Sequence, residues 1–374
     1  MLVTLQYRGR DYGVSGLFNY GNRLQNFALQ EVLKSFGLKV YNLFGDYFVR
    51  FAIRKSLKDM VKRVLATLGV KKYMLNCINS IKHEYFRAKS FEAFDDKYID
   101  GKIFFEGHEV LSLDKSYWDK YDYAITGSDV VWGSAKKEEL EYFYLMFMPK
   151  MKRICYAPSF LGRNFEDIKK NGLYDIHKNG LNGFKRLSCR EKIGCELIKE
   201  ITGREALHVL DPTLLLTADD YRKIARKPKY NVPENFALLY CLCGLQGEHV
   251  NVVNEIHKNM PIINIFDPDD LEHYLTSPEE FLWLIDHANI VLTNSFHGIA
   301  FSVNFKKNFI ALIKPWDKSQ RIESLLSLVG LTSRIYQNDG KIPEGKIDYD
   351  SVYEKLNVRR EISLNYLKEC LNVK

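Results

Sequence analysis

The sequence predicts an α/β fold of two domains that face a cleft. The chain has 374 residues, which is more than one hydrophobic core usually supports. Short apolar runs of strand length alternate with segments of helical periodicity, as in layered α/β proteins. Residues 218–234 interrupt this order with a polar, basic stretch that contains two prolines, which is typical of a linker. Strands in both halves end in polar tips, and a cleft between the halves would bring such tips together.

The first half opens with a strand, a long polar loop and a helix. The strand covers residues 2–7, and the helix covers about 22–36, with its apolar side chains on one face and Gly37 just after its end. Residues 38–43 return as a strand, and a basic, mostly helical insertion follows over about 47–98. Because ligands of such folds bind at the carboxyl ends of parallel strands, the long first loop indicates a binding site.

Four later strands of the first half end in polar or glycine-containing tips. In chain order these tips are Gly127-Ser128-Asp129, Pro158-Ser159-Phe160, Ser188-Cys189-Arg190-Glu191 and Asp211-Pro212. The carboxyl ends of parallel strands lie at the same edge of a sheet, so we expect the four tips to gather there.

The second half restarts the alternation of strands and helices after the linker. Strands are expected in "FALLYCLC", "MPIINIF", "ANIVLTN" and "NFIALI". A helix before the third strand has clear start signals, with Ser277 as its cap, Pro278 in its first turn and Glu280 completing a capping box. We therefore expect one Rossmann-like domain over residues 1–217, a second over 235–345, and a C-terminal helix within 346–374 that packs back on the first domain.

Composition and charge describe an ordered protein that is only modestly basic. Hydrophobic residues make up 46% of the chain, as in ordered globular proteins. The net charge of +7 and the pI of about 8.8 are lower than expected for a dedicated nucleic-acid-binding protein. The whole net charge lies in residues 50–72, an amphipathic segment with eight basic residues and one acid. Such a helix can contact an anionic membrane surface. The alternative is that its apolar face packs on its own domain, and this interpretation is slightly favoured.

Cysteines and hydropathy point to a reducing compartment. The seven cysteines form neither an even framework nor a C-x-x-C pair. No apolar stretch has the length of a membrane span or of a signal-peptide core. The sequence therefore predicts a cytoplasmic protein that is soluble or bound peripherally to the inner face of the plasma membrane.

A polar break in the apolar stretch 288–305 marks the first candidate site. Asn294, Ser295 and His297 lie between a strand ending at about Leu292 and a helix expected from Gly298 onward. Free N–H groups and the dipole at a helix N-terminus favour an anion, and an imidazole there could act as a general acid. The alternative is a capped helix with a histidine in its turn, and this stretch alone does not favour either interpretation.

Three basic residues could join an anion site of this kind. Arg190 follows a strand and precedes a helix, where a guanidinium can hold a carboxylate or phosphate in bidentate fashion. Lys318 and Arg321 follow the next strand of the second half. Taken alone, Arg190 is better explained by a salt bridge. Two cations beside a helix N-terminus strengthen the anion interpretation, and the alternative for Lys318 and Arg321 is surface charge at the start of a helix.

Polar residues near two strand tips could recognise a sugar. Asp129, just past a strand, could orient or deprotonate a sugar hydroxyl, or cap a turn. Asn22 could hydrogen-bond a sugar, although helix capping is the more common role for such a residue. The chain has no G-x-G-x-x-G after its first strand, no P-loop, no H-E-x-x-H and no acidic metal cluster, so no metal site and no resident cofactor are expected.

Seven stretches in this order resemble the polysaccharide pyruvyl transferase family. They are "NYGNRLQNFALQEVLKSFG", "YDYAITGSDVVW", "YAPSFLG", "LSCREK", "LDPTLLL", "TNSFHGIAFSVNF" and "KSQRIESLL", which together span about residues 21–329. The resemblance implies a two-Rossmann, glycosyltransferase-B-like fold. It also implies transfer of a pyruvyl group from phosphoenolpyruvate to a sugar, usually as a ketal that bridges two hydroxyls.

The resemblance also implies which residues form the site. It assigns Arg190 and His297 to phosphoenolpyruvate, with Asn294, Ser295 and Phe296 beside them and a basic residue that could be Lys314, Lys318 or Arg321. On the acceptor side we expect Asn22, Gln25, Ser128 and Asp129. We expect His297 to supply a proton or hold the phosphate, Arg190 to clamp an anionic group and Asp129 to assist a sugar hydroxyl.

Two departures from the family pattern bear on substrate binding. Val130 stands where the family usually has glutamine, and Leu161 is an additional residue before the glycine of "YAPSFLG". The acceptor could therefore differ, and a lipid-linked sugar of bacterial cell-surface polysaccharide synthesis would suit a basic helix at the membrane. The rival functions are a nucleotide-sugar glycosyltransferase of the same fold, including sialyltransferase-like enzymes, and a non-catalytic protein that binds carbohydrate or anions.

Overall fold

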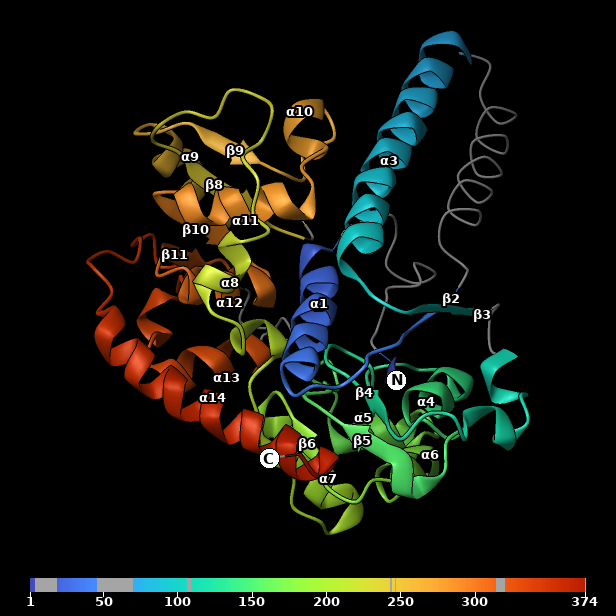
Figure 1. Ribbon diagram of the computed structural model, residues 1–374. Helices are drawn as coiled ribbons and strands as arrows, with labels where there is room; N and C mark the ends of the chain where they lie inside the picture. Colours follow the sequence, from blue (N-terminus) through green and yellow to red (C-terminus); the bar gives the residue numbers. More distant parts are fainter. Residues whose placement is uncertain are drawn as a thin grey trace.

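Two parallel β-sheets, one in each half of the chain, organise the molecule (Figure 1). The computed structural model describes residues 1–3, 19–45, 70–105, 109–242, 244–245, 247–313 and 320–373, and of residues 2–3 and 70–82 it describes the backbone alone. The first sheet has the order β3-β2-β1-β4-β5 and the second the order β11-β10-β8-β9, while β6 and β7 pair separately. Every strand pair is parallel, so the α/β prediction is confirmed.

The strands are short and fall in the predicted apolar runs. Their bounds are β1 Leu2–Val3, β2 Asn42–Gly45, β3 Lys102–Phe105, β4 Ala124–Thr126, β5 Arg153–Cys155, β6 Ser188–Cys189, β7 Leu207–His208, β8 Ala237–Tyr240, β9 Ile262–Asn264, β10 Ile290–Thr293 and β11 Asn308–Ala311. All residues of β8 and β10 are buried, as expected for parallel strands covered on both faces. The expected strand over residues 38–43 was placed too early, because only its last two residues belong to β2.

Helices connect these strands and cover the sheets. Their bounds are α1 Tyr20–Ser35, α3 Val70–Tyr98, α4 Lys137–Phe143, α5 Phe165–Lys170, α6 Tyr174–Leu181, α7 Lys192–Thr202, α8 Ala218–Arg222, α9 Glu248–His257, α10 Leu271–Tyr274, α11 Pro278–His287, α12 Phe296–Asn304, α13 Gln320–Val329 and α14 Tyr349–Leu371. Single 3-10 turns are η2 Glu109–Leu111, η3 Lys115–Trp118, η4 Lys150–Lys152, η5 Pro212–Leu214 and η6 Thr332–Arg334. No helix among the described residues is both long enough and apolar enough to cross a membrane.

Helix start signals were read correctly in one case and needed correction in two. The capping box of Ser277 and Glu280 at α11 is present as predicted. At α1 the cap is Asn19, which accepts a hydrogen bond from the Asn22 N–H, so Asn22 does not cap its own helix. Helix α12 begins at Phe296, two residues before the expected Gly298, because the Ser295 hydroxyl already caps the Gly298 N–H.

Helix α1 lies between the two halves and belongs to the core of both. The Tyr20 ring stacks on Phe281 at 4.5 Å, and its hydroxyl donates to the Thr276 carbonyl at 2.8 Å, although the latter two residues lie in the second half. On its other side, Asn42 of β2 donates to Gln30 at 2.8 Å. The start of α1 is therefore held by the second half, while its later turns lie over the first sheet.

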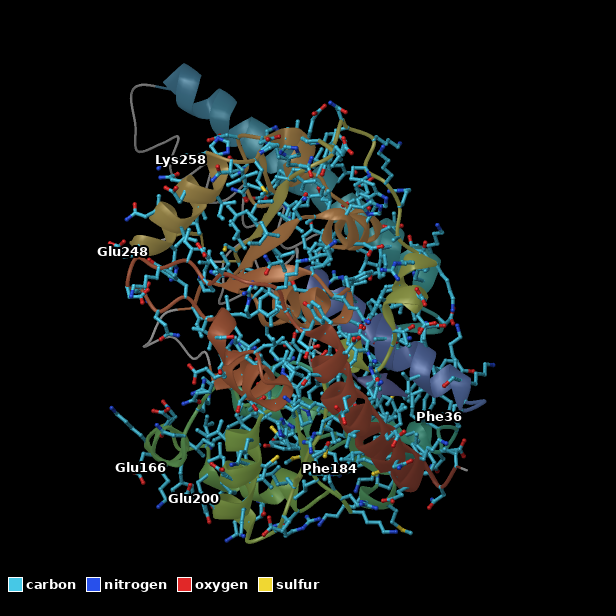
Figure 2. All side chains as sticks on the ribbon, turned by 90° about the vertical axis from the view of Figure 1, so that its left-hand side faces the viewer. Phe36, Glu166, Phe184, Glu200, Glu248 and Lys258 are labelled. Atoms are coloured by element: carbon cyan, nitrogen blue, oxygen red, sulfur yellow. The ribbon has the colours of Figure 1, made fainter. Side chains whose placement is uncertain are left out.

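Two later segments also connect the halves. Residues 218–222, the start of the expected linker, form α8, whose Tyr221 is fully buried and donates to the Thr213 carbonyl at 3.0 Å. Helix α14 runs along both halves (Figure 1): Arg360 donates to the Leu214 carbonyl at 2.6 Å and to Asn304 of α12 at 3.0 Å. Figure 2 shows the second half above the first in that view, with Glu248 and Lys258 in the upper part and Glu166 and Glu200 in the lower part.

Candidate active site

Polar tips of four neighbouring strands meet at one edge of the first half. Asp129 follows β4, Ser159 follows β5, Arg190 follows β6 and Asp211 follows β7. Backbone bonds join the first three tips: the Ser159 N–H donates to the Asp129 carbonyl at 2.9 Å, and the Arg190 N–H donates to the Pro158 carbonyl at 3.3 Å. The tips gather as the sequence predicted, and hydrogen bonds between neighbouring tips fix their relative positions.

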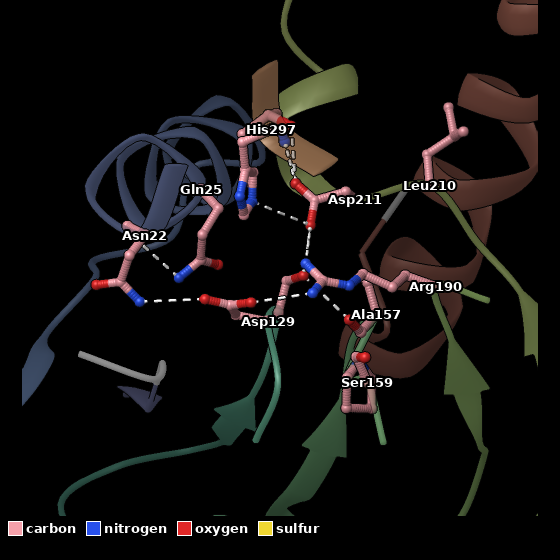
Figure 3. Close-up of polar contacts among 12 residues, drawn as sticks. Asn22, Gln25, Asp129, Ala157, Ser159, Arg190, Leu210, Asp211 and His297 are labelled. Atoms are coloured by element: carbon pink, nitrogen blue, oxygen red, sulfur yellow. Dashed lines mark hydrogen bonds and ion pairs between the residues drawn. The ribbon is translucent and has the colours of Figure 1, made fainter. Parts of the chain in front are cut away.

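Arg190 lies between two buried carboxylates (Figure 3). One terminal nitrogen, Nη2, donates to Asp129 Oδ1 at 2.9 Å, and the other, Nη1, donates to Asp211 Oδ2 at 2.8 Å. The Arg190 side chain is 0% exposed, and its guanidinium carbon lies 4.7 Å from the centre of the Phe296 ring. The guanidinium is therefore already paired with two carboxylates, which the sequence could not indicate, while its Nε has no hydrogen-bond partner among the described residues.

Asp211 holds more of the site together than any residue named from the sequence. Its Oδ1 accepts from the Thr213 N–H at 3.0 Å and the Thr213 hydroxyl at 2.8 Å. Its Oδ2 accepts from the Ser128 hydroxyl at 2.8 Å, as well as from Arg190. Sequence reasoning placed Asp211 at a strand tip but gave it no role, although a tip that ends in an acid was the same signal that singled out Asp129.

His297, on α12 of the second half, lies beside the cluster of Asp129, Arg190 and Asp211. It lies in the first turn of α12, and its Nε2 is 3.8 Å from Asp211 Oδ2, an ion-pair distance that is too long for a hydrogen bond. The start of α1 covers the ring closely, since a Cβ on Gly21 would lie only 2.0 Å from His297 Cγ. Position 21 therefore requires glycine, and α1 sets the position of His297 from the side opposite Asp211.

The acceptor candidates on α1 point into the same cluster. Asn22 donates to Asp129 Oδ2 at 3.3 Å and accepts from Arg23 at 3.1 Å, which orients its amide. Gln25 is fully buried and donates to the Asn22 carbonyl at 3.2 Å, while its Oε1 has no hydrogen-bond partner among the described residues. Ser128 is also fully buried, and its hydroxyl lies 2.8 Å from Asp211 Oδ2. It therefore helps to fix the Asp211 carboxylate.

The other predicted donor-site residues fall into two groups. Ser295 caps α12, and Asn294 accepts from the Leu242 N–H at 2.9 Å, so both have bonds within the second half. Arg321 lies in the first turn of α13 and is close enough to lower the pKa values of Asp129 and Glu191. Lys314 and Lys318 lie outside the described residues.

Burial and neighbouring charge set the protonation of the cluster. Burial raises the pKa of Asp129 and of Asp211, but Arg190 and His297 outweigh it and bring both pKa values below the ordinary range. Burial lowers the pKa of His297, and Asp211 and Asp129 oppose this effect only in part. Burial raises the pKa of Glu191, the N-cap residue of α7, whose side chain makes no capping bond but accepts from the Phe160 N–H at 3.0 Å. The arrangement is two ionised carboxylates on one arginine, with an adjacent imidazole that can exchange a proton.

The described residues include no group of histidine, cysteine and acidic side chains arranged to hold a metal ion. Asp129 and Asp211 are instead paired with Arg190, as described above.

Comparisons with known proteins identify the family. The sequence profile of the family described as polysaccharide pyruvyl transferase matches residues 19–313. No curated protein matches the chain. Among solved structures, a UDP-GlcNAc 2-epimerase from Neisseria meningitidis bound to UDP-GlcNAc aligns with a TM-score of 0.44 and 8% identity, covering 100% of this chain and 94% of the other. Because the family profile covers most of the sequence and includes every described residue of the cluster, the protein belongs to the polysaccharide pyruvyl transferase family.

Proposed function

We propose that the protein transfers a pyruvyl group from phosphoenolpyruvate to two hydroxyls of a sugar, forming a ketal, in bacterial cell-surface polysaccharide synthesis. The observation that carries the proposal is the meeting of the α12 N-terminus and His297 with the Asp129–Arg190–Asp211 chain. Family membership supports a pyruvyl transferase. The donor and the ketal product are our inference.

The start of α12 is suited to the anionic donor. Its Gly298 N–H is capped by Ser295, whereas the N–H groups of Phe296 and His297 donate to no group within the described residues. Such N–H groups and the helix dipole favour a phosphate. Arg321 adds positive charge nearby. Phosphoenolpyruvate carries a phosphate and a carboxylate, so it could use this helix start together with Arg321 and a protonated His297.

The chemistry requires one proton donor and a base for each of the two hydroxyl protons. The π electrons of the enol C=C bond take a proton at the methylene carbon, which leaves a cation at C2. A sugar hydroxyl bonds to C2 and gives up its proton. The C2–O bond to phosphate then breaks with its electron pair, and a second hydroxyl bonds to C2 and gives its proton to the departing phosphate. General acid–base assistance of this kind is worth about 10²–10⁴-fold in rate. We assign proton donation to His297 and acceptance of a hydroxyl proton to Asp129.

The environment of His297 is compatible with proton donation. Burial keeps its pKa below the ordinary value, so the imidazolium is acidic, while Asp211 and Asp129 limit that effect. A phosphate bound at the α12 N-terminus would further favour the charged form. Arg190 then serves mainly to hold the two carboxylates, unless the donor displaces one of them as the sequence-based assignment requires.

The acceptor side and the membrane contact rest on fewer observations. Asn22, Gln25 and Asp129 present amide and carboxylate groups, which suit sugar hydroxyls. We propose a lipid-linked sugar as acceptor and a cytoplasmic location at the inner face of the membrane. Most of the basic segment 50–72 lies outside the described residues, so this part of the proposal depends on sequence alone.

Phosphate release from phosphoenolpyruvate tests the proposal directly. The full chain is incubated with phosphoenolpyruvate and a panel of galactosides, glucosides and mannosides, and release is expected only with one acceptor class. A thermal-shift comparison with UDP- and CMP-sugars runs in parallel. Stabilisation by a nucleotide sugar and not by phosphoenolpyruvate would instead indicate the nucleotide-sugar glycosyltransferase. Stabilisation by phosphoenolpyruvate without release for any acceptor would indicate a non-catalytic anion-binding protein.

A further inference from the structure

The two carboxylates on Arg190 differ in how completely their oxygens are used. We propose that Asp211 is a positioning residue: its fixed negative charge, 3.8 Å from His297 Nε2, orients the imidazole and favours its protonated form, and Asp129 is left to face the acceptor. This division of roles rests on the proposed function, but the alignment of His297 by Asp211 can be measured without any substrate.

Asp211 has little capacity to take a proton from a substrate. Its two oxygens together accept four hydrogen bonds, two from Thr213, one from Ser128 and one from Arg190, all between 2.8 and 3.0 Å. The single Ser128 O–H also faces the Ala157 carbonyl at 3.0 Å, so the donors take most of the about four lone-pair sites of the carboxylate. Asp211 is 2% exposed and Asp129 is 3% exposed, so the hydrogen bonds, and not burial, distinguish the two carboxylates. Asp211 therefore acts as a fixed negative charge.

The Asp129 carboxylate accepts fewer hydrogen bonds than Asp211, so it can accept more. It accepts one bond from Arg190 at 2.9 Å and a longer one from Asn22 at 3.3 Å. Both donors lie at the edges of the carboxylate, and Asn22 belongs to α1, on the side from which the acceptor candidates point. A sugar hydroxyl can therefore add to Asp129 without removing a bond that holds the cluster.

The position of His297 leaves Asp211 as its orienting partner. Among the described residues, Asp211 is the carboxylate at ion-pair distance from the imidazole. Gly21 covers the opposite part of the ring, because a Cβ there would lie 2.1 Å from Nδ1. The ring is thus confined between the α1 backbone and Asp211, and Nε2 is the nitrogen that faces the carboxylate. At 3.8 Å the interaction is electrostatic and not a hydrogen bond, which agrees with a carboxylate whose oxygens already have other donors.

The charged groups around His297 predict the sign of the effect. Asp211 and Asp129 raise the pKa of the imidazole, whereas Arg190 and Arg321 lower it. Removal of the Asp211 charge leaves the two arginines opposed by Asp129 alone. The proton on His297 should then be lost at lower pH, and in the proposed reaction this would shift the alkaline limb of the pH–rate profile downward.

The test is an NMR titration of His297 in the full chain labelled at its histidines, with His297→Gln to assign the signal. We expect Asp211→Asn to lower the His297 titration midpoint by about one pH unit or more, the size of effect that a nearby opposite charge produces. Asp129→Asn should lower it less. An unchanged midpoint in Asp211→Asn, or a larger shift in Asp129→Asn, would overturn the proposal, whatever the enzyme's substrate.

A gentler variant covers the case in which Asp211→Asn does not fold. Thr213→Val removes one hydroxyl bond to Asp211 Oδ1 and leaves every charge in place. We expect about a tenfold lower kcat, an unchanged KM for both substrates and a less sharply defined His297 tautomer in the nitrogen chemical shifts. A raised KM with unchanged kcat would show that Asp211 serves binding and not alignment of His297, and would contradict the proposal.

Discussion

The two halves of the molecule have parallel sheets, yet they supply different chemistry to the site. In the first half, the tips of β4, β6 and β7 bring together Ser128 and Asp129, Arg190, and Asp211. In the second half, one tip, between β10 and α12, supplies His297 and backbone N–H groups. The first half thus contributes fixed charges and the second an imidazole at a helix N-terminus.

This difference shows why neither half would suffice for the proposed reaction. The carboxylates of the first half are ionised and repel an anionic donor, whereas the α12 N-terminus attracts one. Helix α1 fixes the position of the two halves relative to each other at the site. The Tyr20 hydroxyl bonds to the second half, and Asn22 bonds to Asp129 in the first. The following predictions separate the roles of the two halves.

Removal of the imidazole should have the largest effect. His297→Ala removes the proposed proton donor and one contact to phosphoenolpyruvate. We therefore expect kcat to fall by about 10³–10⁴-fold, near the upper range for general acid catalysis. Phosphate release at saturating substrates measures it. His287→Ala is the matched control, since His287 is exposed and stacks on Trp283 at 3.8 Å. Turnover within about tenfold of wild type for His297→Ala would remove His297 from the mechanism.

Removal of the Asp129 charge should have the next largest effect and a different kinetic signature. Asp129→Asn takes away the base proposed for the sugar hydroxyl, so kcat should fall by about 10²–10³-fold. Binding of phosphoenolpyruvate, measured by thermal shift, should persist, because the α12 N-terminus is unchanged. The exposed Asp119→Asn serves as control. If Asp129→Asn abolished donor binding and left kcat unchanged, the first half would contain the donor site.

A methyl group at the junction of the halves should disturb the site without changing any charge. In Gly21→Ala the new Cβ would lie 2.0–2.4 Å from three atoms of the His297 ring, so the ring must move. A displacement of about 1 Å at a reacting group can cost about 10²-fold in rate. Gly180→Ala is the control, since its Cβ would lie 2.2 Å from the Tyr144 ring in the core. Gly180→Ala should lower the denaturation midpoint but keep turnover per folded molecule, and equal turnover losses in both variants would contradict this distinction.

Buried histidines of the first half should make stability depend on pH. Burial lowers the pKa of His177 to about 3 and that of His208 to about 4. The unfolded chain takes up these protons near pH 6.5, so the folded state loses stability as the pH falls below that value, by about 1.4 kcal/mol per pH unit and histidine. Asp129 and Asp211, whose pKa values are lowered, add to the loss only below about pH 4.

Urea denaturation between pH 7 and pH 4.5 measures this dependence. His177→Gln removes one titrating group, so its free energy of unfolding should fall less steeply with decreasing pH than that of wild type. His177 accepts from or donates to the Tyr144 hydroxyl at 2.6 Å, so the variant will be less stable at every pH, and only the slope is diagnostic. An unchanged slope would show that His177 is not neutral in the fold.

The smallest effect is expected for a helix cap in the second half. Ser277→Ala removes the hydroxyl that caps the Glu280 N–H of α11 and should cost about 1 kcal/mol of unfolding free energy. Turnover should not change, because α11 contributes no side chain to the cluster. A loss of activity without a loss of stability would mean that α11 supports the site through Tyr20, which stacks on its Phe281.

Much of this architecture could be predicted because its signals are local. The apolar runs of β8 and β10, the capping box at α11 and the histidine at the start of α12 each depend on fewer than about ten consecutive residues. The family motifs are equally local, and they predicted Arg190 and His297, while the strand end before Asp129 predicted that residue. The boundaries were less certain, since α12 starts two residues before the predicted position through the Ser295 cap.

Asp211 and the position of α1 could not be predicted in this way. The sequence offers Arg190 several acidic partners, and only the packing of strand tips selects Asp129 and Asp211, which lie 61 and 21 residues away along the chain. Adjacent Glu191, in contrast, approaches Arg190 Nε only to 3.8 Å. Likewise, the apolar face of α1 shows that the helix is buried, but not that its first turn packs against His297.

The sequence by itself therefore determined the α/β class, the family and the residue types of the site, since periodicity, caps and motifs are properties of short segments. The tertiary structure alone decided which charges pair, that Arg190 is occupied by two carboxylates, and that Gly21 and Asp211 confine His297 from opposite sides. The physical reason is that ion pairs and close contacts depend on distances of a few ångströms between segments far apart in the chain, and those distances are set by how the two halves and α1 pack.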